Sequence, residues 1–415
     1  MTWQATQLKR VASLIPGGTP SIEESRFWSQ DNEGTAWVTI ADMTRSAPVE
    51  STLRRLTPDG LASKRLQIHP PGTVLFAMYA TVGAVNVLGV PAAWNQAILG
   101  IQPRPGLSET RFLTYWLQSL RPRLSALFRS NTQDNLNAEQ VAALPFPSRP
   151  SQEQRAIADF LDAKTARIDA LIANKTKLVV LLEERVRVMS AELACGRPYN
   201  ATLSYSGHDW LGAIPGHWSV EPLKNVARLE SGHTPSRTRP ELWTHCTIPW
   251  VTLNDLSYLA THEFVHRTTN LISEAGLASS SARLLPAGTV IMSRDATVGR
   301  CGILAHPMAT SQHFVNWVCF ERMSPRYLWL VLTSSMQQHF ESLTAGATLK
   351  TIGMPDVKAL VVPVPPLEEQ QRIVEHAEQI RARMNTGVAL LRRQIGVITE
   401  RRQALITAAV TGELV

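Results

Sequence analysis

The sequence predicts an α+β protein built by tandem duplication, with two globular mixed α/β domains separated by two long helices that form an antiparallel coiled coil. The first observation is that GTVLFAMYATVG at 72–83 returns at 288–299 as GTVIMSRDATVG, with seven of twelve letters unchanged. The second is that the segments 151–197 and 367–415 hold none of the 11 tryptophans and have the pattern of long helices. The third is that glycine and proline punctuate the remaining sequence, as they do turns between short strands.

The repeat covers nearly the whole chain. LKRVASLIPGGTPS at 8–21 matches LKNVARLESGHTPS at 223–236 at an offset of 215, and from residue 72 onward the offset stays at 216. A period of about two hundred residues is too long for a solenoid of small stacked repeats, so two full domains are implied. We therefore expect a first domain at 1–150, a first helix at 151–197, a second domain at 198–366 and a second helix at 367–415.

Within the domains, short strands and a few helices are expected. PGTVLFAMY and PAGTVIMSR predict strands that are entered from a turn. RFLTYWLQSLRPRLSALF predicts a helix that its proline interrupts, and PRYLWLVLTSSMQQHFESL predicts a helix at the equivalent place in the second domain.

Apolar residues in both long segments recur at alternating three- and four-residue steps, the spacing of a heptad seam. Polar residues interrupt the seams at different places: Lys175 stands where the second helix has Leu391, and Gln394 stands where the first has Leu178. Each seam alone is imperfect, which favours mutual pairing, while packing of each helix on its own domain stays the alternative. The predicted helix-pairing residues are Ile157, Leu161, Ile168, Leu171, Leu178, Leu182 and Met189 in the first helix, and Ile373, Ile380, Met384, Leu391, Ile398 and Leu405 in the second.

Composition excludes several classes of protein. No run of 18 apolar residues exists and the N-terminus lacks an apolar signal core, so we expect no membrane span and a cytoplasmic location. The four cysteines form no CxxC pair, which argues against a zinc site or a disulfide scaffold. The net charge of +7 permits a polyanionic partner.

Sequence motifs give little support for an enzyme. Neither a GxxxxGK[ST] phosphate loop nor a GxGxxG nucleotide-binding motif is present. HEFVH at 262–266 fits the HExxH pattern of zinc peptidases, but it lies between polar turns without an amphipathic helix. We interpret it as a chance match in a surface strand or loop, and assign no catalytic residue and no metal ligand.

Two similar but unequal domains that are separated by long helices suit a protein that recognises two different target sites. Helices of roughly 40 residues extend about 60 Å, while one turn of duplex DNA measures about 34 to 36 Å. A bipartite DNA site is therefore predicted.

The order of domain, helix, domain and helix resembles the specificity subunit of type I restriction-modification enzymes. The stretches that carry this resemblance are ALPFPSRPSQEQRAIADFLD at 143–162 and ALVVPVPPLEEQQRIVEHAE at 359–378, with EERVRVMSAELACG and TERRQALITAAVTG closing the helices. The resemblance implies a non-catalytic subunit whose two target-recognition domains read the halves of a gapped, asymmetric site in double-stranded DNA. The paired helices would set the gap and dock two modification subunits.

The cofactors and further partners are also implied by the resemblance alone. No cofactor is expected in this chain: S-adenosylmethionine would be held by the modification subunits, which methylate adenine N6, and ATP and Mg by two restriction subunits. Two alternatives stay open, a specificity subunit of a type IIB-like methyltransferase and nuclease, and a coiled-coil scaffold without DNA binding.

Base reading requires amides, guanidiniums and hydroxyls that reach base edges. Alternatives exist for most candidates: a plain structural turn for the TPS segments, an internal salt bridge for Arg294 with Asp295, and a structural hydrogen bond for Gln96 and Gln312. The tryptophans are expected in the core. The predicted DNA-binding residues are Thr19, Ser21, Tyr79, Thr81, Gln96, Arg129, Asn131, Gln133, Thr234, Ser236, Arg237, Arg239, Arg294, Asp295, Thr297, Gln312 and Lys350.

Overall fold

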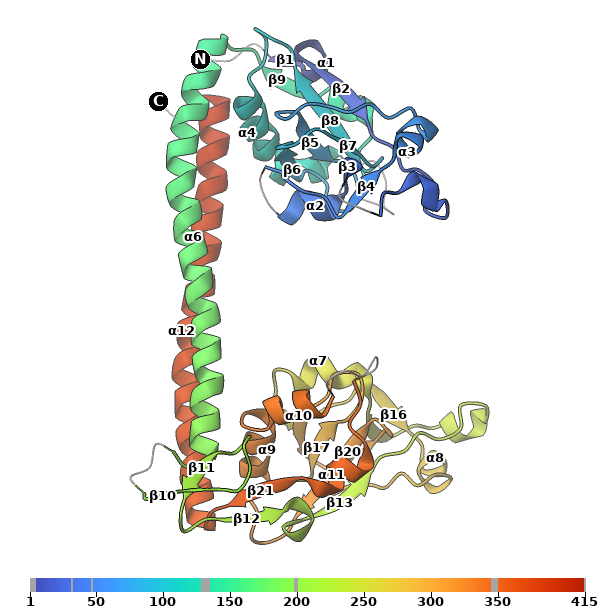
Figure 1. Cartoon of the computed structure of the whole chain (residues 1–415), viewed down its shortest axis with the longest axis vertical. Helices are drawn as coiled ribbons and strands as arrows, with labels where there is room; N and C mark the ends of the chain where they lie inside the picture. The colour runs from blue at the N-terminus through green and yellow to red at the C-terminus, as the bar shows by residue number, and fades with distance from the viewer. Residues whose placement is uncertain are drawn as a thin grey trace. The chain divides into compact units, whose positions relative to one another are not determined.

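The computed structural model describes residues 5–30, 33–45, 48–127, 135–197, 201–344 and 350–413. The chain divides into two compact units, each of which combines one globular part with segments of both long helices (Figure 1). Unit 1 contains residues 1–177 and 392–415, and unit 2 contains residues 178–391. We call the globular parts head 1, residues 5–150, and head 2, residues 201–366.

Head 1 contains short strands interleaved with short helices, as the punctuation by glycine and proline predicts. Its strands are β1 Ala5–Gln7, β2 Ala12–Pro16, β3 Thr35–Val38, β4 Arg54–Leu56, β5 Val74–Ala77, β6 Val85–Val87, β7 Ala92–Trp94, β8 Ile98–Pro103 and β9 Pro145–Pro147. Its helices are α1 Leu8–Val11, η1 Ser25–Phe27, α2 Ile40–Arg45, α3 Pro58–Ser63, α4 Thr110–Leu120, η2 Arg121–Leu127 and α5 Ala138–Ala142.

Head 2 repeats this series with a few additions. Its strands are β10 Leu203–Tyr205, β11 Ala213–Pro215, β12 Ser219–Pro222, β13 Ala227–Ser231, β14 Ile248–Val251, β15 Phe264–Val265, β16 Asn270–Ile272, β17 Val290–Ser293, β18 Cys301–Leu304, β19 Ala309–Thr310, β20 Phe314–Cys319 and β21 Val361–Val364. Its helices are η3 Leu223–Asn225, η4 Pro240–Trp243, η5 Leu253–Asp255, α7 Leu256–Leu259, α8 Glu274–Ala278, α9 Pro325–Thr333, α10 Gln337–Leu343 and α11 Met354–Ala359.

The sheets confirm the duplication. The main sheet of head 1 has the order β2-β8-β5-β6, and that of head 2 has β13-β20-β17-β18 followed by the additional strand β15. The second sheet has the order β4-β3-β7 in head 1 and β16-β14-β19 in head 2. The twin phrases at 72–83 and 288–299 both begin at a turn and then form the central strands β5 and β17, which are buried along their whole length.

One helix in each head lies between the main sheet and the long helices. In head 1, Phe112 and Trp116 of α4 share a buried cluster with Val74 of β5 and with Leu161 and Ile406 of the long helices. In head 2, α9 occupies the equivalent place, and its Tyr327 hydroxyl donates a hydrogen bond to Ala194 O at 2.8 Å. Each long helix is therefore part of the core of the unit in which it lies.

The two long helices are α6, Ser151–Ala194, and α12, Leu367–Thr411. A buried glutamine ties the first turn of each helix to its head. Gln154 Nε2 donates to Leu107 O and Arg149 O at 3.0 and 2.8 Å, while its Oε1 accepts from Glu109 N at 2.9 Å. In unit 2, the same three bonds join Gln370 to Arg322 O, Pro365 O and Ser324 N. The glutamine that recurs in both EQ pairs thus has a structural role.

The helices pair antiparallel, as predicted. In unit 1, Arg402 Nε donates to Asp169 Oδ1 at 2.7 Å, and Lys175 Nζ donates to Gln394 Oε1 at 2.7 Å. Residue numbers rise along α6 as they fall along α12, which defines the antiparallel direction. The two polar interruptions of the seams therefore bond to each other, since Lys175 and Gln394 are the residues that differ from their repeat equivalents.

The predicted seam is wrong at two positions of α6. Leu171 and Leu178 are 45% and 44% exposed, while the adjacent Ile172 is half-buried and Val179 is only 7% exposed. The steps Ile168, Ile172, Lys175, Val179 and Leu182 preserve the three- and four-residue alternation once the polar Lys175 is accepted as a seam residue. A seam predicted from apolar residues alone excludes Lys175, and it therefore shifts to Leu171 and Leu178, each one residue from the true seam. The other predicted helix-pairing residues are buried or half-buried.

Among the described residues, no helix combines the length and the apolar composition that a membrane span requires. The limits proposed above for the two recognition domains stay a prediction. The helix starts at Ser151 and Leu367 coincide with two of those limits.

Candidate nucleic-acid interface

A tight turn follows the first strand of the main sheet in each head. In head 1, Gly18 N donates to Trp94 O at 2.9 Å. A Cβ on Gly17 would lie 2.1 Å from Asn95 O, so only glycine fits so close to a neighbouring backbone. The turn at 17–21 is thereby held against the loop that precedes β8. The equivalent contacts in head 2 join Gly232 to Ser311 and His233 to Thr310.

A threonine–glutamine hydrogen bond joins the same two loops through side chains. The Thr19 hydroxyl donates to Gln96 Oε1 in head 1, and the Thr234 hydroxyl donates to Gln312 Oε1 in head 2. Gln96 and Gln312 are both exposed, and the threonines are half-buried. The pair therefore orients an amide at the surface of each head.

The loop that contains ATVG lies beside the glutamine in both heads. In head 1, Met78 N donates to Ala97 O at 2.8 Å, directly after Gln96. Ala80 has φ of 61°, in the left-handed region that costs a non-glycine residue about 1–2 kcal/mol. In head 2, Arg294 N donates to His313 O at 2.9 Å, and Ala296 has φ of 63°. Such strain persists only where the surroundings impose it, often at functional sites.

The tract before the last short helix of each head completes the cluster. Leu136 N donates to Met78 O at 3.0 Å in head 1, and Ile352 N donates to Arg294 O at 2.9 Å in head 2. Lys350 is exposed beside this bond. Arg129, Asn131 and Gln133 lie outside the described residues. We call the four adjacent segments the loop cluster of each head: 17–21, 78–83, 94–97 and 135–137 in head 1, and 232–236, 294–299, 310–313 and 350–353 in head 2.

The two loop clusters share a backbone frame but differ in side chains. Head 1 presents Tyr79, which is 39% exposed. At the equivalent place in head 2, Asp295 Oδ2 lies 2.8 Å from His313 Nδ1 and 3.8 Å from Arg294 Nε. The alternative of an internal ion pair between Arg294 and Asp295 is therefore present, and Asp295 also shares a shorter hydrogen bond with His313. Thr81 and Thr297 are exposed in both copies of the loop.

The remaining predicted residues lie at the outer end of the first turn. Ser21 and Ser236 are exposed, and their carbonyls accept hydrogen bonds from the indoles of Trp28 and Trp243 at 2.9 and 3.0 Å. Arg237 and Arg239 are exposed in head 2. The Arg239 guanidinium donates to Glu241 at 2.7 Å and so lowers the pKa of that carboxyl group.

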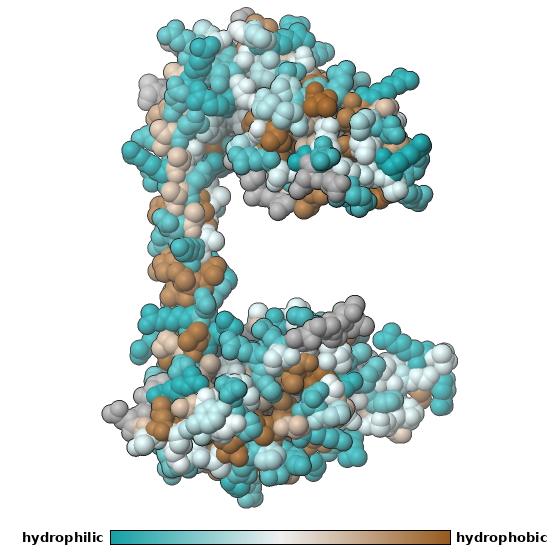
Figure 2. Space-filling model, viewed as in Figure 1, coloured by the Kyte–Doolittle hydropathy of each residue, from teal (hydrophilic) through white to brown (hydrophobic). Residues whose placement is uncertain are grey.

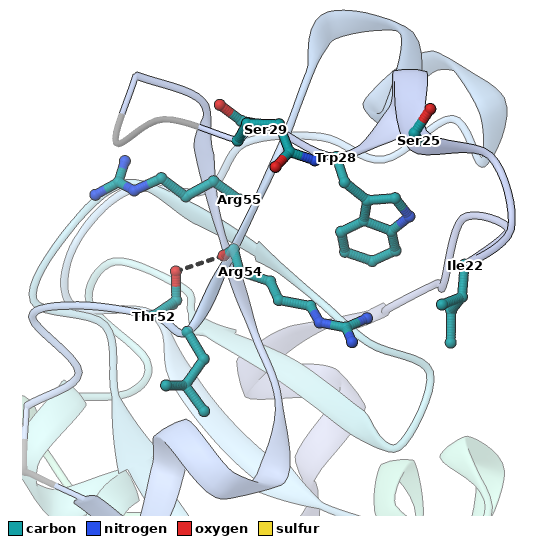
Figure 3. A pocket seen from close by; sticks show the side chains of 9 residues that line it. Ile22, Ser25, Trp28, Ser29, Thr52, Arg54 and Arg55 are labelled. Carbon is teal, nitrogen blue, oxygen red and sulfur yellow. Dashed lines mark hydrogen bonds between the residues drawn. The ribbon is translucent and has the colours of Figure 1, made fainter. Parts of the chain in front are cut away.

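A hollow that the sequence did not indicate lies next to this turn in head 1. Its cavity volume is about 370 Å³, and its lining includes Trp28, Thr52, Arg54 and Arg55 (Figure 3). The Arg54 guanidinium carbon lies 5.2 Å from the centre of the Trp28 ring, while Arg55 donates to Gly34 O at 2.7 Å. The only signal in the sequence is the doublet of arginines, which head 2 lacks at Asn270 and Leu271.

HEFVH at 262–266 does not form a zinc-peptidase helix. Phe264 and Val265 form strand β15, so His262 and His266 are not one helical turn apart. Glu263 is bonded to Arg326 Nε at 2.5 Å, and together with Glu378 it raises the pKa of that guanidinium. In the described part of the chain, no group of three His, Cys, Asp or Glu side chains is arranged to hold a metal ion.

Comparison with known proteins identifies the family of the chain that contains these loop clusters. A family model described as the type I restriction modification DNA specificity domain matches residues 1–180 and 215–387. The chain belongs to this family. The two matched stretches of the specificity domain coincide with the duplication seen in the fold.

Individual members of the family match parts of the chain. The type I restriction enzyme MjaIX specificity subunit of Methanocaldococcus jannaschii is 31% identical over 166 residues, 39% of this chain and 38% of that protein. The HindI specificity subunit of Haemophilus influenzae is 25% identical over 231 residues, 52% of this chain and 50% of that protein. The chain thus spans half or less of these two relatives.

A solved structure shares the fold over the full length. It belongs to a study of complex assembly and conformational transition of the type I R-M system. The match has a TM-score of 0.71 and 17% identity, and covers 100% of this chain and 98% of the other.

Proposed function

We propose that this chain is the sequence-specific DNA-recognition subunit of a type I restriction-modification complex, and that it has no catalytic residue of its own. Each head reads one half of a bipartite, gapped target in double-stranded DNA. The observation that carries the proposal is that both heads assemble the same four segments into one loop cluster and place different side chains on it. A loop cluster with the same backbone but different side chains in the two heads suits the recognition of two different half-sites.

The chemistry of the loop clusters supports contact with DNA. They present amides, hydroxyls and, in head 2, a guanidinium and a lysine, which are the groups that contact base edges and phosphates. Arg54 in the neighbouring hollow of head 1 adds a cation stacked on an indole, a pair that suits a phosphate or a base. The net charge of +7 favours association with a polyanion.

The surface of the long helices supports a role in docking protein partners. Apolar side chains at Leu171, Leu178, Leu181 and Val188 are 44 to 50% exposed, and their spacing of seven, three and seven residues places them on one side of α6. On α12, Leu390 and Val397 are 56% and 58% exposed, again seven residues apart. In Figure 2 brown patches interrupt the hydrophilic surface of these helices. Such stripes mark protein interaction sites.

Membership of the family supports a proposal for the partners and their cofactors. Two modification subunits bind the helices, carry S-adenosylmethionine and methylate adenine N6, and two restriction subunits supply ATP- and Mg-dependent cleavage. The complex acts in the cytoplasm, where the host DNA is found.

The experiment that tests this proposal is co-expression of the chain with its modification subunit, followed by mapping of N6-methyladenine across the host DNA at single-base resolution. We expect a new asymmetric, gapped motif. An assembled complex that adds no methylation would contradict the proposal and favour the scaffold interpretation.

The docking surface has its own test. Leu178→Lys replaces an exposed apolar side chain by a charge and is expected to abolish co-purification of the modification subunit. Lys177→Ala, at the neighbouring exposed position, serves as the matched control and is expected to leave assembly intact.

A further inference from the structure

Two pairs of glutamines occupy equivalent positions in the duplicated chain, but their surroundings differ. Gln154 and Gln370 are completely buried, and each makes three hydrogen bonds that use both ends of its amide. Gln96 and Gln312 are exposed, and the threonine hydroxyl binds only the amide oxygen. A glutamine retained in both copies for structural reasons should resemble the first pair, which the second does not.

The amide groups of Gln96 and Gln312 are held ready for a ligand. Free glutamine loses considerable rotamer entropy when it binds, and an existing hydrogen bond lowers that cost. The carbonyl oxygen has two lone pairs, of which the threonine hydroxyl uses one. The described residues offer Gln96 Nε2 no hydrogen bond, and Gln312 Nε2 has only a contact of 3.5 Å with His313 Nε2. One acceptor site and the amide donors therefore stay available in each head.

The backbone around the two amides is the same in both heads, but the neighbouring side chains differ. Tight turns at Gly17 and Gly232 hold both threonines in place. Beside Gln96 the head presents Tyr79, whereas beside Gln312 it presents Asp295 bonded to His313. The neighbouring side chains can therefore distinguish the two half-sites, while the amide presents the same chemistry to both.

An adjacent acceptor and donor on one amide match adenine in the major groove. Adenine presents its N6 amino group as a donor and N7 as an acceptor, and glutamine binds both at once. At the same groove, guanine presents two acceptors, cytosine one donor, and thymine an acceptor with a methyl group. None of these offers the complementary pair.

We propose that Gln96 and Gln312 each read one adenine, so that both half-sites contain an A·T pair read in the same way by the equivalent residue. The inference rests on the proposed function, because it assumes that the loop clusters contact DNA. Thr19 and Thr234 are positioning residues that hold the amide and do not touch the base.

The test is a selection from random duplexes. The complex of this chain with its co-expressed modification subunits is mixed with a library of random DNA duplexes, and the bound fraction is sequenced. We expect Gln96→Ala to abolish the preference for one A·T pair in one half-site and leave the other half-site unchanged. Gln312→Ala is expected to do the same in the other half-site.

A single-atom probe then tests the contact itself. 7-Deazaadenine lacks N7, and at the position identified by Gln96→Ala it should weaken binding of the unmodified complex about 10-fold, within the range for one bidentate base contact. The same substitution should have no effect on the Gln96→Ala complex. Thr19→Val keeps the amide but removes the hydroxyl that orients it, and is expected to weaken the same preference in part.

Control variants distinguish a loss of base recognition from a loss of protein stability. Gln102→Ala changes another exposed glutamine of head 1, outside the loop cluster, and should leave all preferences intact. If Gln96→Ala weakens binding to every duplex equally, or lowers the melting temperature without changing any preference, the inference is wrong while the proposed function stands. Loss of preference at a G·C pair would overturn the assignment to adenine. If the unmodified complex selects no sequence, the proposed function itself fails.

Discussion

At the scale of single residues, side chains that recur in both copies have separate roles. Asp42 and Asp255 are buried, and each accepts hydrogen bonds from the backbone N–H and hydroxyl of a threonine three residues earlier. These aspartates fix a loop, as do the buried glutamines at the helix starts. The exposed Gln96 and Gln312 do not. Recurrence alone therefore does not distinguish structure from recognition, whereas burial and complete hydrogen bonding do.

Gln370 offers a direct test of a buried amide. Gln370→Ala removes three hydrogen bonds to backbone groups and is expected to lower the free energy of unfolding by about 3 kcal/mol, at about 1 kcal/mol or more for each bond. Gln371→Ala, at the adjacent exposed position, should change it by less than about 0.5 kcal/mol. Urea denaturation measures both, and equal effects would contradict the structural role of Gln370.

The four cysteines are predicted to differ in reactivity. Burial raises the pKa of Cys195 to about 11 and that of Cys319 to about 12, and it also raises the pKa of Cys301. Because the thiolate is the reactive form, these three thiols should be inert at pH 8. We expect a chromogenic disulfide reagent to label only the partly exposed Cys246 in the native protein and all four cysteines after unfolding. Cys246→Ser should abolish native labelling, and fast reaction at Cys195 would disprove the expectation.

At the scale of elements, the residues that form the seam of each long helix are determined by the other helix. Lys175 and Gln394 are polar seam residues that bond across the pair, an arrangement that fixes register at some cost in stability. Leu171 and Leu178 fit the heptad spacing equally well in the sequence, yet they are exposed. The seam is set by the partner helix and by the head that packs against each helix segment, and neither is contained in the sequence of one helix.

The glycines of α12 provide a test at this scale. A Cβ added at Gly387 or Gly396 meets no atom within 4 Å. Replacement by alanine should therefore stabilise the isolated chain by about 1 kcal/mol at each position, the difference in helix propensity between the two residues. Thermal or chemical denaturation measures the gain. A loss of stability would show that the helix is distorted there, and weaker assembly with the modification subunit would place that partner against the glycine.

At the scale of the whole molecule, the duplication produces two heads that share one framework. Both heads have the same order of equivalent strands, with β15 added in head 2, and the same four-segment loop cluster. They differ at Tyr79, Asp295 and His313 of that cluster. The proposed function assigns the shared framework to folding and assembly, and the differences to the two half-sites.

We propose that the paired helices set the gap between the half-sites, and lengthening both helices tests this role. Seven residues inserted after Lys177 in α6 and after Leu391 in α12 preserve the heptad seam and lengthen both helices by about 10 Å. We expect the gap of the methylated motif to grow by about three base pairs at 3.4 Å each, with both half-sites unchanged. Insertions of four residues at the same places break the heptad register and should impair assembly. An unchanged gap after the seven-residue insertion would refute the spacer role.

Features that depend on local residue patterns could be predicted from the sequence. The repeat predicted two heads of one topology, the heptad spacing predicted two long helices, and the polar turns around HEFVH predicted a strand or loop there in place of a helix. Such features follow from residue spacing along the chain, because helix and strand periods are properties of the backbone.

The contacts between side chains from distant parts of the chain became visible in the folded structure. It joined Thr19 to Gln96 and Thr234 to Gln312, brought His313 to Asp295, and placed Arg54 over Trp28. It also separated the buried Gln154 and Gln370 from the exposed Gln96 and Gln312. Contacts between residues distant in the chain depend on the register of strands and on packing between elements, and side-chain burial follows from those contacts.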